Sequence, residues 1–417
     1  MSDDAFAKLG LHPDLARGAA AMGFTAPTPI QAAAVPPALE GRDVLGCAQT
    51  GGGKTAAFAL PVLHRLLAAP GRTGVRALVL VPTRELAAQV ETTFRDCGRF
   101  ASLTTALVIG GAGFSEQRRA LEGGAAVVVA TPGRLADHLR RKTARLGSVE
   151  ICVLDEADRM LDMGFIPVIK EIFAALPKQR QTFLFSATLG AGIDKVAAFT
   201  LRNPVRVEVS KPDAVAAGIT QMVYPVPQDR KTELLAALLR AAGLRSGLVF
   251  TRTKHGADRL AKRMASRGFS VGILHSGRTQ GQRTAAMEDF RSGRIQVLIA
   301  TDVAARGIDV REISHVVNFD VPRHPEDYVH RVGRTARAHG VGDAMTLMSP
   351  DEEPFLRDIE KFTGVTFPRA VLPGFPALPP AAPQGSPAKP AAPKPPSTAP
   401  KGFHGHRGYA GSSRRRR

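Results

Sequence analysis

The sequence predicts two tandem α/β domains, each built on a doubly wound parallel sheet, followed by a disordered basic tail. Short apolar runs typical of buried parallel strands alternate with helical segments over residues 43–186, and a second such series covers 247–348. A glycine-rich phosphate loop follows the first run, and two adjacent acids follow the fifth. Both motifs suit strand ends, where open parallel sheets bind ligands. The chain of 417 residues, 44% hydrophobic and 22% charged, is long enough for two such cores.

We expect the first domain at residues 1–209, a linker at 210–218, the second domain at 219–367 and the tail at 368–417. The strands predicted for the first domain are Val44–Cys47, Ala77–Val81, Thr105–Ile109, Ala126–Ala130, Ile151–Leu154 and Thr182–Phe185. Those predicted for the second are Gly247–Phe250, Val271–Leu274, Gln296–Ile299, His315–Phe319 and Ala344–Met348. The tail is rich in proline and lysine or arginine and lacks acids, which predicts either a basic tether or a solubility arm.

Residues 48–55 fit the phosphate-loop pattern G-x-x-x-x-G-K-[ST], with Ala48 in place of the first glycine. Backbone N–H groups of such a loop cradle phosphate oxygens at a helix N-terminus. Lys54 is expected to meet the terminal phosphates, and the Thr55 hydroxyl to ligate Mg²⁺. The remaining loop residues expected to bind the nucleotide are Gln49, Thr50, Gly51, Gly52 and Gly53.

Asp155 and Glu156 follow the apolar run that ends at Leu154. Taken alone, they could form a solvated acidic loop. Beside a phosphate loop, however, Asp155 suits the metal that Thr55 would hold, and Glu156 suits the attacking water. Together the two motifs indicate a site for nucleoside triphosphate hydrolysis.

The net charge of +19 indicates a polyanionic partner, nucleic acid before membrane. The three cysteines lack the spacing of a zinc site or a disulfide framework, which suits a reducing compartment. No run has membrane-spanning length, and the acidic start of the chain lacks the apolar core of a signal peptide. We therefore expect a cytoplasmic location and no membrane partner.

Three further strand ends carry glycine, hydroxyl or arginine groups that suit phosphodiester oxygens. Each alone could be an ordinary helix N-cap, but three on one sheet edge favour a track for a single strand of nucleic acid. The residues of this track are Pro82, Thr83, Arg84, Gly110, Gly111, Thr131, Gly133 and Arg134.

The stretch before the phosphate loop offers Gln31, whose amide can read an adenine edge, and Phe6, whose ring can stack on a base. The residues favour this interpretation and a local capping role for Gln31 equally. Ser186 and Thr188, which end the last strand of the first domain, could relay hydrogen bonds from the acidic motif or cap a helix.

Arg331, Arg334 and Arg337 recur every three residues and would share one face of a helix or turn. A surface ion-pair ladder is the alternative. Because the first domain has no obvious arginine for the γ-phosphate, an arginine finger offered across a cleft would supply that charge.

These motifs together resemble those of the DEAD-box RNA helicases of superfamily two, over about residues 6–350. The carriers are Phe6, GFTAPTPIQ (23–31), AQTGGGKT (48–55), PTREL (82–86), GG (110–111), TPGRL (131–135), DEAD (155–158), SAT (186–188), VFTRT (249–253), ATDVAARGID (300–309) and HRVGRTAR (330–337). The short N-terminus and basic tail are similar to those of the bacterial RhlE-like subgroup.

The resemblance implies two RecA-like domains and an ATP-dependent RNA helicase that uses ATP and Mg²⁺. It implies that Phe6 and Gln31 select adenine, that Asp309 meets the ribose, and that Arg334 and Arg337 are the fingers. The enzyme would grip and bend one RNA strand on domain closure, separate short duplexes or remodel RNPs, and release RNA after hydrolysis.

The resemblance also assigns roles to residues in both domains. His330 would join an interdomain network, with Asp158, Ser186 and Thr188 as coupling residues. The residues added to the RNA-binding set are Thr251, Arg252 and Thr301. Where the family usually has serine this chain has Gly52, which removes a hydroxyl near the phosphates and bears on nucleotide affinity.

The alternative function is an ATP-gated RNA clamp or annealing factor with little net unwinding. DNA helicases and transport ATPases share the phosphate loop, but Asp158 and the HRVGRTAR stretch disfavour them. Ribosome-assembly or RNA-decay factors fit such an enzyme as partners, although no motif identifies one.

Overall fold

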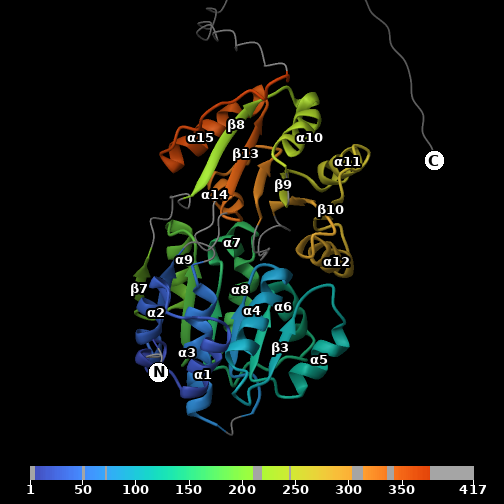
Figure 1. Ribbon diagram of the computed structural model, residues 1–417. Coiled ribbons are helices and arrows are strands. Elements are labelled where there is room, and N and C mark those ends of the chain that lie inside the picture. The colour runs from blue at the N-terminus through green and yellow to red at the C-terminus, as the bar shows by residue number, and fades with distance from the viewer. Residues whose placement is uncertain are drawn as a thin grey trace, which may run out of the picture. The chain divides into compact units, whose positions relative to one another are not determined.

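The computed structural model describes residues 5–48, 52–70, 73–209, 218–243, 246–302, 313–335 and 342–375 (Figure 1). They form two α/β domains, each organised around its own sheet, as predicted. Each sheet is parallel throughout, because every pairing between its named strands is parallel.

The first sheet has seven strands in the order β3-β4-β2-β5-β6-β1-β7. Their bounds are β1 (Val44–Cys47), β2 (Ala77–Leu80), β3 (Thr105–Val108), β4 (Val127–Ala130), β5 (Ile151–Leu154), β6 (Gln181–Ser186) and β7 (Val205–Glu208). Successive side chains alternate between the two faces, so Val79 joins one core while Leu78 and Leu80 join the other.

Helices cover both faces of this sheet (Figure 1). The first face packs against η1 (Ala7–Leu9), α1 (Pro13–Ala21), α2 (Pro29–Leu39), α3 (Lys54–Ala68) and α4 (Arg84–Cys97). The second packs against α5 (Phe114–Glu122), α6 (Pro132–Arg140), α7 (Ala157–Asp162), α8 (Ile166–Ala174) and α9 (Ala191–Thr200). Burial on both faces explains why the central strands are continuous apolar runs in the sequence.

The second sheet has six strands in the order β10-β11-β9-β12-β13-β8. Their bounds are β8 (Ile219–Pro225), β9 (Gly247–Thr251), β10 (Val271–Leu274), β11 (Val297–Thr301), β12 (His315–Asn318) and β13 (Gly342–Met348). One face packs against α10 (Lys231–Ala241) and α11 (Lys254–Ala265). The other packs against α12 (Gln280–Arg291), α14 (Pro325–Val332) and α15 (Glu353–Thr363), and two short 3-10 turns are η2 (Gln228–Arg230) and η4 (Pro350–Glu352).

Every strand predicted from an apolar run is present, with small shifts at the ends. The sequence interpretation missed β7 and β8, which lie at the edges of the two sheets. In β7 only Val207 is fully buried, while Arg206 and Glu208 are exposed. Such half-exposed strands alternate polar and apolar residues, so they lack the continuous apolar run on which the prediction depended.

The segment that follows Phe367, the predicted end of the second domain, pairs with β8. The N–H of Val223 in β8 donates to the Pro368 carbonyl at 2.9 Å, and the Ala370 N–H donates to the Val223 carbonyl at 2.8 Å. Phe375 then packs against the core beneath α10 and α11. Residues 368–375, which the sequence interpretation assigned to the tail, therefore lie along the open edge of β8. The bounds of the domains stay a prediction.

Residues 210–217 and 376–417 lie outside the described residues, so the predicted linker and the disorder of the remaining tail stay predictions. Within the described part of the chain, no helix is both long enough and apolar enough to cross a membrane. Cys47, Cys97 and Cys152 are buried.

A buried ion cluster holds the second domain together around Glu352. Its carboxylate pairs with Lys231 of α10 and accepts from Arg252 Nη2 at 2.8 Å, and it also accepts the Val321 N–H at 3.2 Å. The side chains of Lys231 and Glu352 are 0% and 2% exposed. Burial lowers the pKa of Lys231, and the Glu352 carboxylate opposes that shift. Each charge therefore depends on the other for its place in the core.

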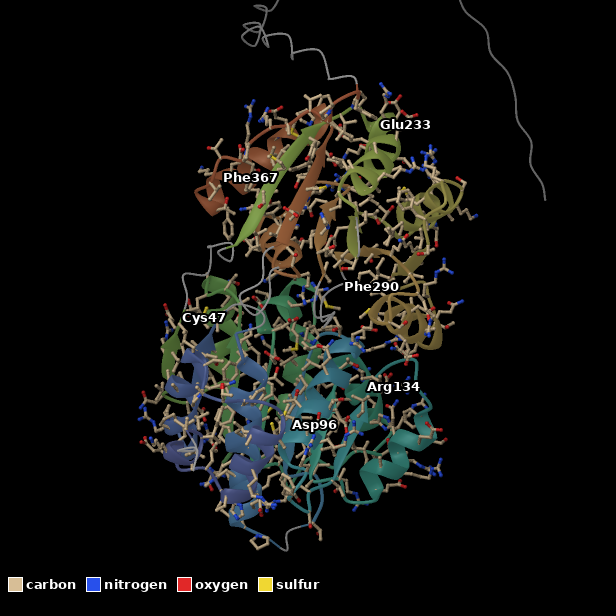
Figure 2. All side chains as sticks on the ribbon, viewed as in Figure 1. Cys47, Asp96, Arg134, Glu233, Phe290 and Phe367 are labelled. Carbon is tan, nitrogen blue, oxygen red and sulfur yellow. The ribbon has the colours of Figure 1, made fainter. Side chains whose placement is uncertain are left out.

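We predict that Glu352→Gln lowers the free energy of unfolding of the full chain by about 3 kcal/mol, because it leaves Lys231 as an uncompensated buried charge. The matched control is Glu233→Gln on α10, which lies at the surface (Figure 2) with a 51% exposed side chain and a local partner, Arg230. The control should change stability by less than about 0.5 kcal/mol. Urea unfolding measures both; equal midpoints for the two variants would contradict the prediction.

Candidate nucleotide and nucleic-acid site

The three motifs expected to handle a nucleotide meet at one edge of the first sheet. β6 lies between β1 and β5, and all three run parallel. Their carboxyl ends therefore bring the phosphate loop after Cys47, the acids after Leu154 and the hydroxyl residues that start at Ser186 side by side. This is the edge at which an open parallel sheet binds ligands.

The described part of the phosphate loop turns directly into α3. Gly53 caps the helix with φ of 89°, and a Cβ there would lie 2.6 Å from Gln31 Nε2. Only glycine accepts that backbone and that contact. Lys54 is buried, and its Nζ donates to the Ala48 carbonyl at 2.7 Å, so the loop closes on its own ammonium group. Gln49, Thr50 and Gly51 lie outside the described residues.

Gln31 links α2 to this loop. Its Oε1 accepts the Thr28 N–H at 3.0 Å in a capping box, and its Nε2 donates to the Gly53 carbonyl at 3.1 Å. The Thr28 hydroxyl donates to the Gly52 carbonyl at 2.9 Å. The local capping role is therefore present in the structure. The amide keeps a second N–H and a second lone pair, so adenine recognition stays a compatible prediction.

Phe6 lies in the hydrophobic core and is 1% exposed, with its ring centroid 6.2 Å from that of Phe24. A base could stack on this ring only after the covering side chains move aside. The stacking role of Phe6 stays a prediction.

Asp155 and Glu156 stand at the turn from β5 into α7. Glu156 has φ of 53°, and its N–H donates to Asp155 Oδ1 at 3.0 Å. Asp155 is 2% exposed. Burial raises the pKa of Asp155 to about 7, with Lys54 acting against the rise and Glu156 adding to it. A buried carboxylate in this position gains from a nearby cation. No group of three or more metal-binding side chains occurs in the described ranges.

Asp158 connects the acidic motif to the end of β6. Its Oδ2 accepts the N–H groups of Ala187 and Thr188, both at 3.1 Å, and the Thr188 hydroxyl at 3.2 Å. Thr188 also donates its N–H to the Ser186 hydroxyl at 3.4 Å. The structure thus brings together the three residues predicted to couple the domains.

The second domain places His330 and Arg334 near this network. His330 lines one cavity of about 540 Å³ with Asp158 and Thr188. Burial lowers the pKa of His330 to about 4, against the opposing influence of Asp158 and with help from Arg334 and Lys54. Arg334 is 3% exposed, and its Nε donates to the His330 carbonyl at 3.2 Å.

The three regularly spaced arginines do not act alike. Arg331 pairs with Asp302, with Nη2 2.8 Å from Oδ2, and donates to the Asn318 side chain at 3.0 Å, so it is a buried structural ion pair. α14 ends at Val332, which places Arg334 in the following turn. The predicted ribose residue Asp309 and the predicted second finger Arg337 lie outside the described residues.

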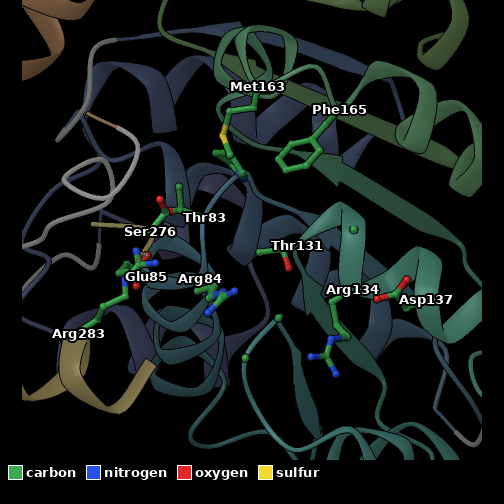
Figure 3. A pocket seen from close by; sticks show the side chains of 14 residues that line it. Thr83, Arg84, Glu85, Thr131, Arg134, Asp137, Met163, Phe165, Ser276 and Arg283 are labelled. Carbon is green, nitrogen blue, oxygen red and sulfur yellow. Dashed lines mark ion pairs between the residues drawn. The ribbon is translucent and has the colours of Figure 1, made fainter. Parts of the chain in front are cut away.

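The predicted track for a single strand forms one cavity of about 490 Å³ (Figure 3). Residues around it come from the segments that follow β2, β3 and β4, from the turn after α7 and from the second domain (Figure 3). All eight predicted residues of the track line it: Pro82, Thr83, Arg84, Gly110, Gly111, Thr131, Gly133 and Arg134. The sequence interpretation missed other lining residues, namely Glu85, Asp137, Met163, Phe165, Ser276 and Arg283.

Arg84 lies directly over the paired glycines. A Cβ on Gly111 would lie 2.3 Å from Arg84 Nη1, and one on Gly110 would lie 3.2 Å from Nη2. Gly111 also has φ of 80°. Glycines at these positions therefore leave space for the guanidinium at the cavity wall.

Two domains meet at the rim of this cavity. Glu85 Oε2 pairs with Arg283 Nη2 of α12 at 2.6 Å, and both side chains are nearly buried. Arg84 Nη1 donates to Gln280 Oε1 at 3.4 Å, and Gln280 Nε2 donates to Glu85 Oε1 at 3.4 Å. Nothing in the sequence pairs these residues, which are far apart along the chain, so only the tertiary structure reveals them.

Thr251 and Thr301 stand opposite each other at the ends of β9 and β11, and both are buried. The Arg252 guanidinium donates to Glu352 at 2.8 Å, and the backbone N–H of Arg252 donates to the Asp320 carboxylate at 2.8 Å. Thr251 and Arg252 line a separate cavity of about 670 Å³. The structure therefore does not bring these three residues into the cavity of Figure 3, and their RNA contacts stay predictions.

Two family models match the chain: the DEAD/DEAH box helicase model over residues 28–196 and the helicase conserved C-terminal domain model over residues 230–339. The DEAD-box ATP-dependent RNA helicase CshA of Bacillus subtilis is 42% identical over 358 residues, which are 86% of this chain and 72% of that protein. The ATP-dependent rRNA helicase RRP3 of Candida glabrata is 42% identical over 88% of this chain and 74% of its own length.

Solved structures of RNA-bound helicases share the fold of this chain. S. cerevisiae Dbp5 bound to RNA and ADP BeF3 has a TM-score of 0.82 at 34% identity, covering 88% of this chain and 96% of that one. Mss116p bound to ssRNA and AMP-PNP has a TM-score of 0.79 at 27% identity, covering 89% of this chain and 79% of that one. The narrower RhlE-like resemblance stays a prediction.

We predict that Gly111→Ala weakens binding of single-stranded RNA about tenfold, because the new methyl group displaces Arg84 and removes one charge-assisted hydrogen bond. The matched control is Gly124→Ala, which has a similar φ of 82° but no atom within 4 Å of the added Cβ. Both variants carry backbone strain, so only the first should lose affinity in a fluorescence anisotropy titration. An equal loss in both would assign the effect to strain instead.

Proposed function

We propose that this chain, which belongs to the DEAD-box helicase family, is an RNA-stimulated ATPase that separates short RNA duplexes or remodels RNPs. The observation that carries the proposal is the placement of the phosphate loop, the Asp155–Glu156 pair and the cavity of Figure 3 along one edge of one sheet. The names of CshA and RRP3 as ATP-dependent helicases of RNA and rRNA support the same activity.

ATP would lie over the N-terminus of α3, where backbone N–H groups and the helix dipole favour phosphate. Lys54, which the loop carbonyl of Ala48 holds in this structure, would turn to the terminal phosphates. Gln31, which contacts Thr28 and Gly53, would report through the loop whether an adenine is present.

The donor set of the site fits Mg²⁺ held mainly by phosphate and water. One buried carboxylate, Asp155, and the hydroxyl of Thr55 are the groups that would hold it. Burial raises the pKa of Asp155 to about 7, and a cation bound there would favour the ionised carboxylate. When bound, Mg²⁺ neutralises charge on the phosphates.

Glu156 would orient the attacking water and accept its proton. Its αL backbone lies at the turn from β5 into α7, directly after Asp155, and both Glu156 and Lys54 influence the pKa of Asp155. Asp158, held by three hydrogen bonds to the Ala187–Thr188 segment, would carry the state of the acids to the domain interface.

RNA would enter the cavity of Figure 3 through its phosphates, because the lining offers arginines, hydroxyls and glycine backbone but no base-reading pattern. Closure of the two domains would bend the strand and exclude its complement. The Glu85–Arg283 pair and the shared cavity of Asp158 and His330 are contacts that support such coupling. Hydrolysis would then release the RNA.

The proposal as a whole is tested by measuring ATP turnover with RNA, with DNA and without nucleic acid, together with displacement of a short duplex. We expect stimulation by RNA above DNA, and duplex separation that requires ATP. Turnover independent of RNA would contradict the proposal, and RNA-stimulated turnover with no strand displacement would favour the ATP-gated clamp.

Glu156→Gln should reduce ATP turnover by roughly two orders of magnitude, which is the contribution of a positioned general base. Binding of ATP and RNA should persist, since the side chain keeps its size. Glu171→Gln serves as the control, because Glu171 pairs only with Arg140 at an exposed position. A Glu156→Gln enzyme with near-normal turnover would show that another group positions the water.

Arg334→Ala should reduce RNA-stimulated turnover about 10³-fold, as removal of an arginine finger does. Nucleotide binding, measured with a fluorescent ATP analogue, should change little because the phosphate loop belongs to the first domain. Arg334→Lys should not restore turnover, since an ammonium lacks the planar fork. Restoration by lysine would mean that only a positive charge is needed.

A further inference from the structure

A second polar cavity lies at the amino edge of the first sheet, opposite the edge that carries the phosphate loop. It has a volume of about 510 Å³, and residues that precede β1, β5, β6 and β7 line it. Gln181 at the cavity and Ser186 at the catalytic edge are the two ends of β6, so roughly 17 Å of strand separates the two edges.

Three arginines line this cavity: Arg65, Arg180 and Arg202. Among the described residues that line it, Glu150 is the sole carboxylate, and it pairs with the buried Arg76 at 2.7 Å. The cavity is therefore positively charged, and its acid is already committed to a neighbour.

Two of the arginines are held in place by their surroundings. Arg65 Nη1 donates to Gln181 Oε1 at 3.2 Å, and Gln181 is itself fixed by its amide to the Ala38 and Arg42 carbonyls, both at 2.8 Å. Arg180 donates to the Pro177 carbonyl at 2.7 Å, and its guanidinium lies 4.7 Å from the centre of the Phe173 ring. Each guanidinium carries five N–H donors, and the bonds described here use one donor of each arginine.

Guanidinium groups match phosphate oxygens in a planar, bidentate geometry. Among the described residues of the lining, none is aromatic and able to stack on a base, and the lining offers glycine backbone and glutamine instead. These features favour phosphate groups over bases as the ligand.

We propose that this cavity is an accessory anchor for the phosphate backbone of a duplex segment that flanks the single strand held in the cavity of Figure 3. The inference rests on the proposed function, since it takes RNA as the substrate. An anchor on the opposite edge would keep a structured RNA bound while the two domains open and close, because tethering raises the local concentration of the strand.

The test compares the full chain with the double variant Arg65→Gln/Arg202→Gln. Both side chains are exposed. The Arg65 substitution removes a hydrogen bond to Gln181, which keeps its bonds to the Ala38 and Arg42 carbonyls, and the bond of Arg202 to Asp43 uses the backbone N–H. We therefore expect the fold to be retained, which circular dichroism checks. The matched control is Arg17→Gln/Arg95→Gln, which removes the same charge from exposed arginines of the same domain that do not line the cavity. The two RNAs are a single strand of about ten nucleotides and the same strand joined to a hairpin.

We expect the double variant to bind the hairpin-flanked RNA about fivefold more weakly at low salt, as the loss of two exposed ion pairs implies. The log–log salt dependence for that RNA should become shallower by up to about 1.8. Affinity for the short strand and turnover at saturating short strand should stay at the wild-type values, and the control should behave as wild type with both RNAs.

Three outcomes would overturn the inference. Wild-type affinity of the double variant for the flanked RNA would do so while leaving the proposed function intact, and an equal loss in the control would reduce the effect to general charge. If inorganic tripolyphosphate binds the wild type but not the double variant, while both bind flanked RNA equally, the ligand is a small phosphate compound.

Failure of the wild type to bind either RNA would instead reject the proposed function.

Discussion

Parallel strand pairing is the constraint on which the rest of this molecule depends. Because all strands of a sheet run the same way, their carboxyl ends share one edge, and residues far apart in sequence become neighbours. β1, β6 and β5 lie next to one another, which places Lys54, Asp158 and Asp155 within electrostatic reach. Moving β1 or β5 away from β6 would separate the phosphate loop from Asp155 and Glu156.

A second constraint is the close approach of polar side chains to glycine backbone at this edge of the sheet. Gly53 admits Gln31 and Thr28 to the phosphate loop, and Gly111 admits the Arg84 guanidinium to the wall of the cavity of Figure 3. In both places a methyl group would occupy the space of a polar side chain that the site uses. Each glycine thus leaves space for the polar side chain of another residue. Both lie outside regular strands, where the conformational freedom of glycine costs less.

The buried charged residues described above are of two kinds: those paired within the second domain, and Asp155 at the sheet edge of the first domain. Glu352 with Lys231, and Arg331 with Asp302, are satisfied pairs that fix the second domain. Asp155 is buried with its pKa raised, and its position next to Lys54 is one that a bound cation and phosphate would stabilise. The buried ion pairs of the second domain thus differ from Asp155, whose raised pKa is typical of a candidate functional site.

The sequence by itself determined the two parallel-sheet domains, because strands buried on both faces must be continuous apolar runs. It also placed the phosphate loop, the Asp155–Glu156 pair and the eight residues predicted for the single-strand track directly after such runs. Parallel pairing brings the ends of those strands to one edge, and the eight residues line one cavity there. The sequence did not reveal β7 and β8, whose half-exposed positions at the sheet edges leave no such run. It also assigned residues 368–375 to the tail, although their value lies in covering the edge of β8.

Only the tertiary structure decided how side chains divide their bonding. It placed Phe6 in the core, gave Gln31 a capping role, and directed Arg331 and Arg252 to acids of their own domain. It also paired Glu85 with Arg283 and gathered the arginines of the amino-edge cavity from separate segments. A local pattern records which residue types are present, whereas a hydrogen bond or an ion pair depends on which distant groups reach the same few ångströms of space.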